Sequence, residues 1–154
     1  MLRRDLGAGV GRRPRAASGA LVRGRPLGNV LGPADLTLVL GHGAAPPWPH
    51  QRLRWPDLWV PLDTDHAVAA LTAAYARARQ GQRVEVACRG GVGRTGTALA
   101  AFAVLDGLAP SGAVAWVRER FHPRAVETPW QRGWLRQLRP LPGASTAVEP
   151  APLR

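Results

Sequence analysis

The stretch VEVACRGGVGRTGTALAAF, residues 84–102, combines three patterns that decide the fold class. Residues 83–87 (RVEVA) alternate valine with other residues, which predicts a short β-strand. Residues 95–105 are apolar nearly all round, which is typical of a helix buried against a sheet. A loop rich in glycine joins the two. The stretch therefore predicts a strand, a tight turn and a helix of an α/β protein.

The glycine-rich loop after Cys88 has the composition of an anion-binding site. Its glycines let successive backbone N–H groups point inward, and the N-terminus of the next helix adds a partial positive charge. The same dipoles, together with Arg94, favour the thiolate form of Cys88, which is the nucleophilic form. The planar guanidinium of Arg94 can bind two phosphate oxygens at once. We therefore expect phosphate to bind at the following residues: Arg89, Gly90, Gly91, Val92, Gly93 and Arg94.

The loop admits three other interpretations. Residues 91–96 match the dinucleotide fingerprint G-x-G-x-x-G, but that fold needs a second strand after the helix, and here another helix is predicted. A nucleotide P-loop needs a lysine, and the chain has none. An inert buried thiol is the commonest fate of a lone cysteine, and the loop alone leaves that alternative open.

The remaining elements fit a single α/β domain. Further short strands are predicted at 20–23, 36–40 and 51–55. Helices are predicted at 65–80, at 110–120 and from about 129 onward. Thr64 or Asp65 is expected to cap the first of these, and Thr128 with Pro129 to begin the last. The predicted fold is a short, mainly parallel central sheet flanked by helices, with a helical C-terminal half.

Asp57, in RLRWPDLWVP at 52–61, is the predicted proton donor. One helix separates it from Cys88, and the loops of a parallel βαβ unit open at the same carboxyl edge of the sheet. The two side chains can therefore face one pocket. An aspartic acid held there by a hinge of Trp55 and Pro56 could protonate a poor leaving group. A solvated loop aspartate is the plain alternative.

Together, these motifs resemble the cysteine-dependent protein tyrosine phosphatases and dual-specificity phosphatases, in a compact bacterial form. The resemblance rests on Cys88-x5-Arg94-Thr95-Gly96 and Trp55-Pro56-Asp57, and it covers about residues 19–139. It implies attack of the Cys88 thiolate on phosphorus, a phosphocysteine intermediate, and Asp57 acting first as acid and then as base. The implied substrate is a phosphorylated protein, on phosphotyrosine or with dual specificity, or a small phosphomonoester.

The resemblance also assigns roles to two further residues. Thr95 matches the hydroxyl that stabilises the departing thiolate, and Gln131 resembles the glutamine that positions the hydrolytic water. A glutamine on an amphipathic helix can equally be a solvated residue, so both interpretations of Gln131 stay open. No metal and no other cofactor is implied, because the four histidines show no ligand spacing and a single cysteine forms no paired zinc ligands.

Departures from the family pattern leave the substrate class open. Ala87 stands where the family usually has the histidine that helps to activate the cysteine, and Trp59 replaces a glycine of the acid loop. No segment matches the phosphotyrosine-recognition loop. Arg89 resembles basic residues of phosphoinositide-directed members, so a polyanionic substrate is an alternative. A catalytically impaired phosphate-binding protein, a pseudophosphatase, is another.

Composition limits the other function classes. The chain has 154 residues, 45% of them hydrophobic, and a formal net charge of +11. All of its cations are arginines, which indicates a GC-rich genome as much as a nucleic-acid ligand. Seven arginines and one acid lie within residues 1–25, so the N-terminal arm could bind nucleic acid or anionic membrane, but no aromatic residues interleave them. We therefore find no strong case for either partner.

The termini and the single cysteine complete the expectations. Residues 1–18 and 140–154 are rich in Gly, Pro and Arg or of low complexity, and we expect both to be disordered around a phosphatase domain at 19–139. Cys88 has no possible disulfide partner within the chain, which favours a reducing compartment. We expect a cytoplasmic monomer, with a transit peptide as the alternative interpretation of the arginine-rich start.

Overall fold

The computed structural model describes residues 20–144. The expected arm at 1–18 and residues 145–154 of the expected tail lie outside the described residues. One sheet is built from β1 (Val22–Pro26), β2 (Leu36–Leu40), β3 (His50–Leu53) and β4 (Val84–Cys88). The strand order is β1-β4-β2-β3, and all three neighbouring pairs are parallel. The predicted α/β class with a parallel central sheet is therefore confirmed.

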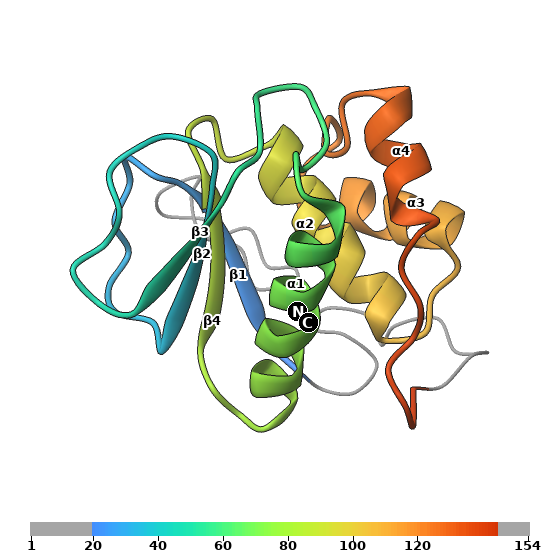
Figure 1. Ribbon diagram of the computed structural model, residues 1–154, viewed down its shortest axis with the longest axis horizontal. Coiled ribbons are helices and arrows are strands. Elements are labelled where there is room, and N and C mark those ends of the chain that lie inside the picture. The colour runs from blue at the N-terminus through green and yellow to red at the C-terminus, as the bar shows by residue number, and fades with distance from the viewer. Residues whose placement is uncertain (1–19, 145–154) are drawn as a thin grey trace.

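Residues 20–144 also form four helices in the predicted order, the first between β3 and β4 and the other three after β4. They are α1 (Thr64–Arg79), α2 (Gly93–Leu105), α3 (Pro110–Arg120) and α4 (Pro129–Leu135). Figure 1 shows the helices gathered on one side of the sheet, with the loops at 27–35 and 41–49 on the other. Every residue of α2 is buried, because α2 packs on β1 and β4 and the other three helices pack around it. This explains why its sequence is apolar nearly all round.

The observed start of α1 and end of β1 differ from the predicted ones. Asp63, rather than Thr64 or Asp65, caps α1, since its side chain accepts a hydrogen bond from the His66 amide at 3.0 Å. Thr128 and Pro129 begin α4 as predicted. β1 runs on to Pro26 through residues typical of turns, because pairing with β4 holds it extended as far as Cys88. Tertiary pairing has overridden local propensity there.

The two faces of the sheet have different chemistry. On the helix side the strands contribute apolar residues to the main core. On the loop side Glu85 is fully buried, forms an ion pair with Arg25 at 2.9 Å, and accepts a hydrogen bond from the Thr37 hydroxyl at 2.9 Å. The indole N–H of Trp48 in turn donates to that hydroxyl oxygen at 2.7 Å. A polar network therefore holds three strands together beneath the loops.

The carboxyl ends of the strands meet at one edge. Pro26 and Leu40 both pair with Cys88 in the sheet register. The loops that follow β3 and β4 lie at the same end of the molecule, at the top of Figure 1. At the far end of the chain the Leu141 amide donates to the Leu105 carbonyl at 2.8 Å, so the described fold continues past residue 139. Within residues 20–144 no helix is long and apolar enough to span a membrane.

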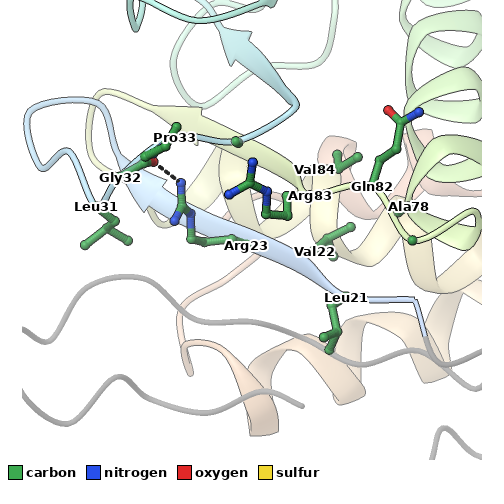
Figure 2. A pocket seen from close by; sticks show the side chains of 12 residues that line it. Leu21, Val22, Arg23, Leu31, Gly32, Pro33, Ala78, Gln82, Arg83 and Val84 are labelled. Atoms are coloured by element: carbon green, nitrogen blue, oxygen red, sulfur yellow. Dashed lines mark hydrogen bonds between the residues drawn. The ribbon is translucent and has the colours of Figure 1, made fainter.

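A cavity of about 360 Å³ lies at the opposite edge, beside the amino-terminal ends of β1 and β4 (Figure 2). Its wall contains Arg23 and Arg83. Arg23 donates to the Gly32 carbonyl at 2.8 Å and pairs with Glu85, and Arg83 pairs with Asp35 at 3.4 Å. Both cations are already matched by carboxylates, so this cavity does not resemble an anion site.

Candidate active site

A cleft of about 580 Å³ opens at the carboxyl edge of the sheet. Its lining includes Cys88, Arg94, Asp57, Trp55 and Pro56. The structure therefore brings the predicted nucleophile, cation, proton donor and hinge residues together around one space. The β4–α2 loop also contributes to the lining, with the residues Arg89, Gly90, Val92 and Gly93.

The sulfur of Cys88 sits at the base of this cleft, and the residue is only 2% exposed. It accepts a hydrogen bond from the Gly91 backbone N–H at 3.1 Å and another from the Thr95 hydroxyl at 3.0 Å. Hydrogen bonds donated to sulfur stabilise its negative charge. Two donors are therefore directed at the sulfur, and Ala87 provides no imidazole beside it.

Two glycines of the loop lie close to other residues. Gly91 has a φ of +71°, and a Cβ there would lie 2.5 Å from the Pro26 backbone nitrogen. A Cβ on Gly93 would lie 2.2 Å from a side-chain oxygen of Glu127. The loop can turn tightly over the end of β1 only because Gly91 lacks a side chain, whereas the neighbour of Gly93 is the flexible Glu127 side chain.

Arg94 links three loops around the cleft. It lies in the first turn of α2 and is 6% exposed. One terminal nitrogen, Nη1, donates to the Leu40 carbonyl at 3.2 Å and to the Trp55 carbonyl at 3.0 Å, which fixes the guanidinium. The Nε atom is buried and has no hydrogen-bond partner within residues 20–144. A fixed cation with an unused donor beside Cys88 is suited to binding an oxyanion.

Gly41 was not predicted to belong to the site. Its φ is +86°, and a Cβ there would lie 2.2 Å from Nη1 of Arg94 and 2.6 Å from the Trp55 carbonyl oxygen. The guanidinium can occupy its position only because residue 41 is glycine. The segment Gly41-His42-Gly43 indicates a turn in the sequence, but nothing local shows that a distant arginine fills the space.

Asp57 projects from the loop at 55–61, which we call the acid loop. Its side chain is 75% exposed, and one carboxylate oxygen lies 3.6 Å from Nε of Arg94. The same oxygen accepts a hydrogen bond from the Leu58 backbone N–H at 3.0 Å. Trp55 is buried beneath the loop, and its indole N–H donates to the Trp59 carbonyl at 2.7 Å. Asp57 therefore stands at the rim of the cleft, above the anion site.

Gln131 does not line the cleft. Its side-chain oxygen accepts from the Thr128 backbone N–H at 3.2 Å in a capping box, and its side-chain nitrogen donates to the Trp59 carbonyl at 3.0 Å. Because both ends of the amide are engaged, the structure does not place Gln131 where it could orient a water molecule beside Cys88. It is also fully buried, so the solvated alternative does not hold either.

A second carboxylate, that of Glu127, was not predicted. Glu127 lines the cleft and lies against Gly93. The preceding residue, Val126, is fully buried with a φ of +61°, a rare conformation for a β-branched residue. Arg118 holds this turn by donating to the carbonyls of Ala125 at 2.9 Å and Val126 at 2.8 Å. No sequence pattern marks Glu127, because its placement depends on this turn.

Cations at the rim complete the cleft. Arg89 and Arg124 both contribute to the lining and are exposed. No ion pair or side-chain hydrogen bond of either guanidinium is found within residues 20–144. The mouth of the cleft therefore offers positive charge to an anionic ligand.

A parallel sheet with a buried cysteine at the end of one strand, an arginine six residues later in the first turn of a buried helix, and an aspartate above them defines a class. It is that of the cysteine-dependent tyrosine and dual-specificity phosphatases. A protein-family model described as PTP-SAK, Swiss Army Knife protein, DSP-PTPase phosphatase domain, matches residues 57–151, more than half of the chain. The chain belongs to this family.

Solved structures are similar in fold. The crystal structure of Tk-PTP in the active form matches with a TM-score of 0.64 and 24% identity, covering 81% of this chain and 96% of that one. The crystal structure of a mutant form of Tk-PTP matches with a TM-score of 0.61 and 25% identity, covering 76% and 88%. None of the curated proteins compared with the chain matches it. The predicted resemblance to compact phosphatases is therefore confirmed.

Proposed function

We propose that the protein hydrolyses phosphomonoesters through a phosphocysteine intermediate, acting on phosphotyrosine or with dual specificity. One observation carries the proposal: the Cys88 sulfur, the unused Nε donor of Arg94 and the Asp57 carboxylate converge on one cleft. These are the nucleophile, the oxyanion ligand and the proton donor that the reaction needs. Membership of the phosphatase-domain family supports the same reaction class.

The first half of the reaction forms the intermediate. Arg94 and the N–H groups of residues 89–94 bind the phosphate oxygens, and the Cys88 thiolate attacks phosphorus. A sulfur–phosphorus bond forms while the bond from phosphorus to the leaving oxygen breaks. Asp57, as the acid, gives its proton to that oxygen, so the product leaves as a neutral alcohol or phenol.

The second half regenerates the thiolate. Water attacks the phosphocysteine, the sulfur–phosphorus bond breaks, and inorganic phosphate is released. The Thr95 hydroxyl and the Gly91 N–H stabilise the departing sulfur, because both already donate to it. A carboxylate of the cleft accepts the proton of the attacking water.

Two carboxylates compete for the proton-transfer roles. We assign the acid to Asp57, because it stands beside Arg94 at the rim where a leaving group would depart. Glu127 lines the same cleft, against Gly93, and is the alternative. Loss of the true acid must slow a poor leaving group more than a good one. Two substrates that differ only in the leaving group therefore show whether Asp57 or Glu127 is the acid.

The test is hydrolysis of 4-nitrophenyl phosphate and phenyl phosphate in the presence of EDTA. We expect turnover by the wild type and none by Cys88→Ser. Asp57→Asn should lose about 100-fold or more in kcat/KM on phenyl phosphate and much less on the nitrophenyl ester, because kcat/KM reports the step in which the leaving group departs. If Glu127→Gln shows that pattern instead, Glu127 is the acid. An inactive wild type that is still stabilised by vanadate would indicate a pseudophosphatase and reject the proposal.

A polyanionic substrate, such as a phosphoinositide, is the second candidate, favoured by the exposed Arg89 and Arg124 at the cleft mouth. It predicts that the double variant Arg89→Gln, Arg124→Gln raises KM for a multiply phosphorylated inositol headgroup about tenfold at low salt. KM for 4-nitrophenyl phosphate should change by less than about twofold. Equal effects on both substrates would remove this candidate.

A further inference from the structure

We propose that Trp130 and Gln131, at the start of α4, are positioning residues that hold the acid loop over Cys88 before any substrate binds. The inference rests on the proposed function, in which Asp57 donates a proton from that loop. It replaces the water-positioning role that the family resemblance implies for Gln131. It also implies that the reaction includes no closure of the acid loop.

Hydrogen bonds attach the loop backbone to α4 directly. The indole N–H of Trp130 donates to the Leu58 carbonyl at 2.6 Å, and the side-chain N–H of Gln131 donates to the Trp59 carbonyl at 3.0 Å. The two acceptors are consecutive residues immediately after Asp57. The backbone that carries the carboxylate is therefore held at two adjacent points by one helix.

Ring contacts add to these bonds. The rings of Trp59 and Trp130 lie 5.4 Å apart between centroids. Trp59 is the residue that stands in place of the glycine usual in the family. Its indole supplies the surface on which Trp130 packs, whereas a glycine would leave only the backbone contacts. The departure seen in the sequence therefore forms part of the attachment.

The helix that holds the loop is itself anchored. The ring of Trp134 packs against that of Trp55 at 5.6 Å, and its indole N–H donates to the Thr64 hydroxyl at 3.3 Å. Leu135 is fully buried, and Gln131 also closes the capping box with Thr128. A displacement of the acid loop would thus require loss of contacts to an element that is fixed on several sides.

Backbone strain shows that the loop conformation depends on these contacts. Leu58 has a φ of +59°, a left-handed conformation that is unfavourable for a residue with a side chain. A free loop would relax out of it. The Leu58 carbonyl is the acceptor for Trp130, and the Leu58 N–H donates to Asp57 at 3.0 Å. The same residue therefore connects the strained turn, the helix and the carboxylate.

Trp130→Phe is the decisive variant. It keeps an aromatic ring against Trp59 but removes the N–H that bonds to Leu58, and residue 130 is 47% exposed, so folding should be preserved. Trp48→Phe is the matched control, since it removes an indole N–H that donates to the Thr37 hydroxyl on the far face of the sheet. Gln131→Glu is a second variant that keeps the oxygen accepting from Thr128 but replaces the donor to Trp59.

Two measurements test the proposal. In the first, Trp130→Phe should lower kcat/KM about fivefold on phenyl phosphate and less than about twofold on 4-nitrophenyl phosphate, because a displaced acid affects the poorer leaving group more. In the second, amide hydrogen exchange over residues 55–62 of the unliganded protein should be about threefold faster in Trp130→Phe than in the wild type. Gln131→Glu should show the same pattern, and Trp48→Phe neither change.

The outcomes separate this inference from the proposed function. Suppose that the wild type is active and that Asp57→Asn shows the larger loss on phenyl phosphate. If Trp130→Phe then has the same kinetics and the same exchange rates as Trp48→Phe, the positioning role is wrong. If vanadate slows exchange of residues 55–62 in the wild type severalfold, the loop closes on the ligand and the proposal is overturned. An inactive wild type rejects the proposed function, and the exchange measurement alone then decides whether α4 holds the loop.

Discussion

The hydroxyl of Thr95 donates a hydrogen bond to the sulfur of Cys88 across 3.0 Å, and both side chains are buried. Thr95 occupies the first turn of α2, so its donor acts in the same direction as the partial charge of the helix N-terminus. The sulfur is charged twice in the proposed reaction, as nucleophile and as leaving group. A fixed donor at this distance stabilises it in both states.

Replacement of Thr95 by valine should therefore reduce turnover without unfolding the protein. We expect kcat for 4-nitrophenyl phosphate to fall about 10- to 100-fold, the cost of a hydrogen bond to a charged group, while Thr95→Ser retains most of the activity. Thr97→Val is the matched control, because the Thr97 hydroxyl is buried in the same helix but donates to the Gly93 carbonyl at 2.8 Å. Equal losses in the two valine variants would contradict a specific effect on sulfur.

The two adjacent glycines of the loop should differ sharply in their tolerance of alanine. At Gly91 an alanine needs a φ of +71° and would clash with Pro26, so we expect Gly91→Ala to lower the free energy of unfolding by about 2 kcal/mol or more. At Gly90 nothing lies within 4 Å of the added carbon, and the change should stay within about 1 kcal/mol. Urea unfolding of both variants measures this difference. A similar loss of unfolding free energy in both would contradict a loop conformation in which Gly91 alone lies against Pro26.

Much of the fold was predictable, because it depends on local patterns that agree with the tertiary structure. The valine-rich run before Cys88, the apolar segment of α2 and the Thr128-Pro129 start of α4 each carry a local signal, and each element forms where it was expected. The convergence of Cys88 and Asp57 was predictable as well. It follows from the common carboxyl edge of parallel strands, which does not require knowledge of side-chain packing.

The residues that escaped prediction are those whose role depends on a distant partner. Gly41 resembles any turn glycine until the guanidinium of Arg94 is placed beside it. Glu127 reaches the cleft only through a strained turn at Val126 that Arg118 holds from α3. Gln131 carries the right residue type for the role first assigned to it. Its amide is instead bonded to Thr128 and Trp59, contacts that only the packed acid loop and α4 define.

The space at Gly41 leads to a prediction about the anion site. Gly41→Ala would force the guanidinium of Arg94 away from the Leu40 and Trp55 carbonyls, since the new carbon would lie 2.2 Å from Nη1. We expect affinity for vanadate, measured by inhibition or by thermal stabilisation, to fall about tenfold or more. Gly28→Ala, in a loop position with nothing within 4 Å, is the control. Unchanged vanadate affinity in Gly41→Ala would show that Arg94 does not depend on this space.

Asp35 provides a prediction about stability and pH that is independent of the active site. Its carboxylate accepts from the Arg83 backbone N–H at 2.7 Å and lies 3.4 Å from the guanidinium, so the start of β2 is tied to the residue before β4. The backbone hydrogen bond from Arg83, followed by the side-chain bond and the positive charge, lowers the pKa of Asp35 below its ordinary value.

A carboxyl whose pKa is lower in the folded than in the unfolded protein stabilises the fold above the unfolded pKa, about 3.9, and loses that contribution as pH falls through the folded pKa. Asp35→Asn keeps an oxygen for the Arg83 N–H but has no charge to titrate. We therefore expect the variant to be less stable than the wild type by a constant amount from about pH 5 to 7, with the difference shrinking steadily below about pH 4. Urea unfolding of both proteins between about pH 3 and 7 measures this. A difference that persists unchanged to the acid end of that range, or that grows on acidification, would show that the charged form of Asp35 is not what binds Arg83.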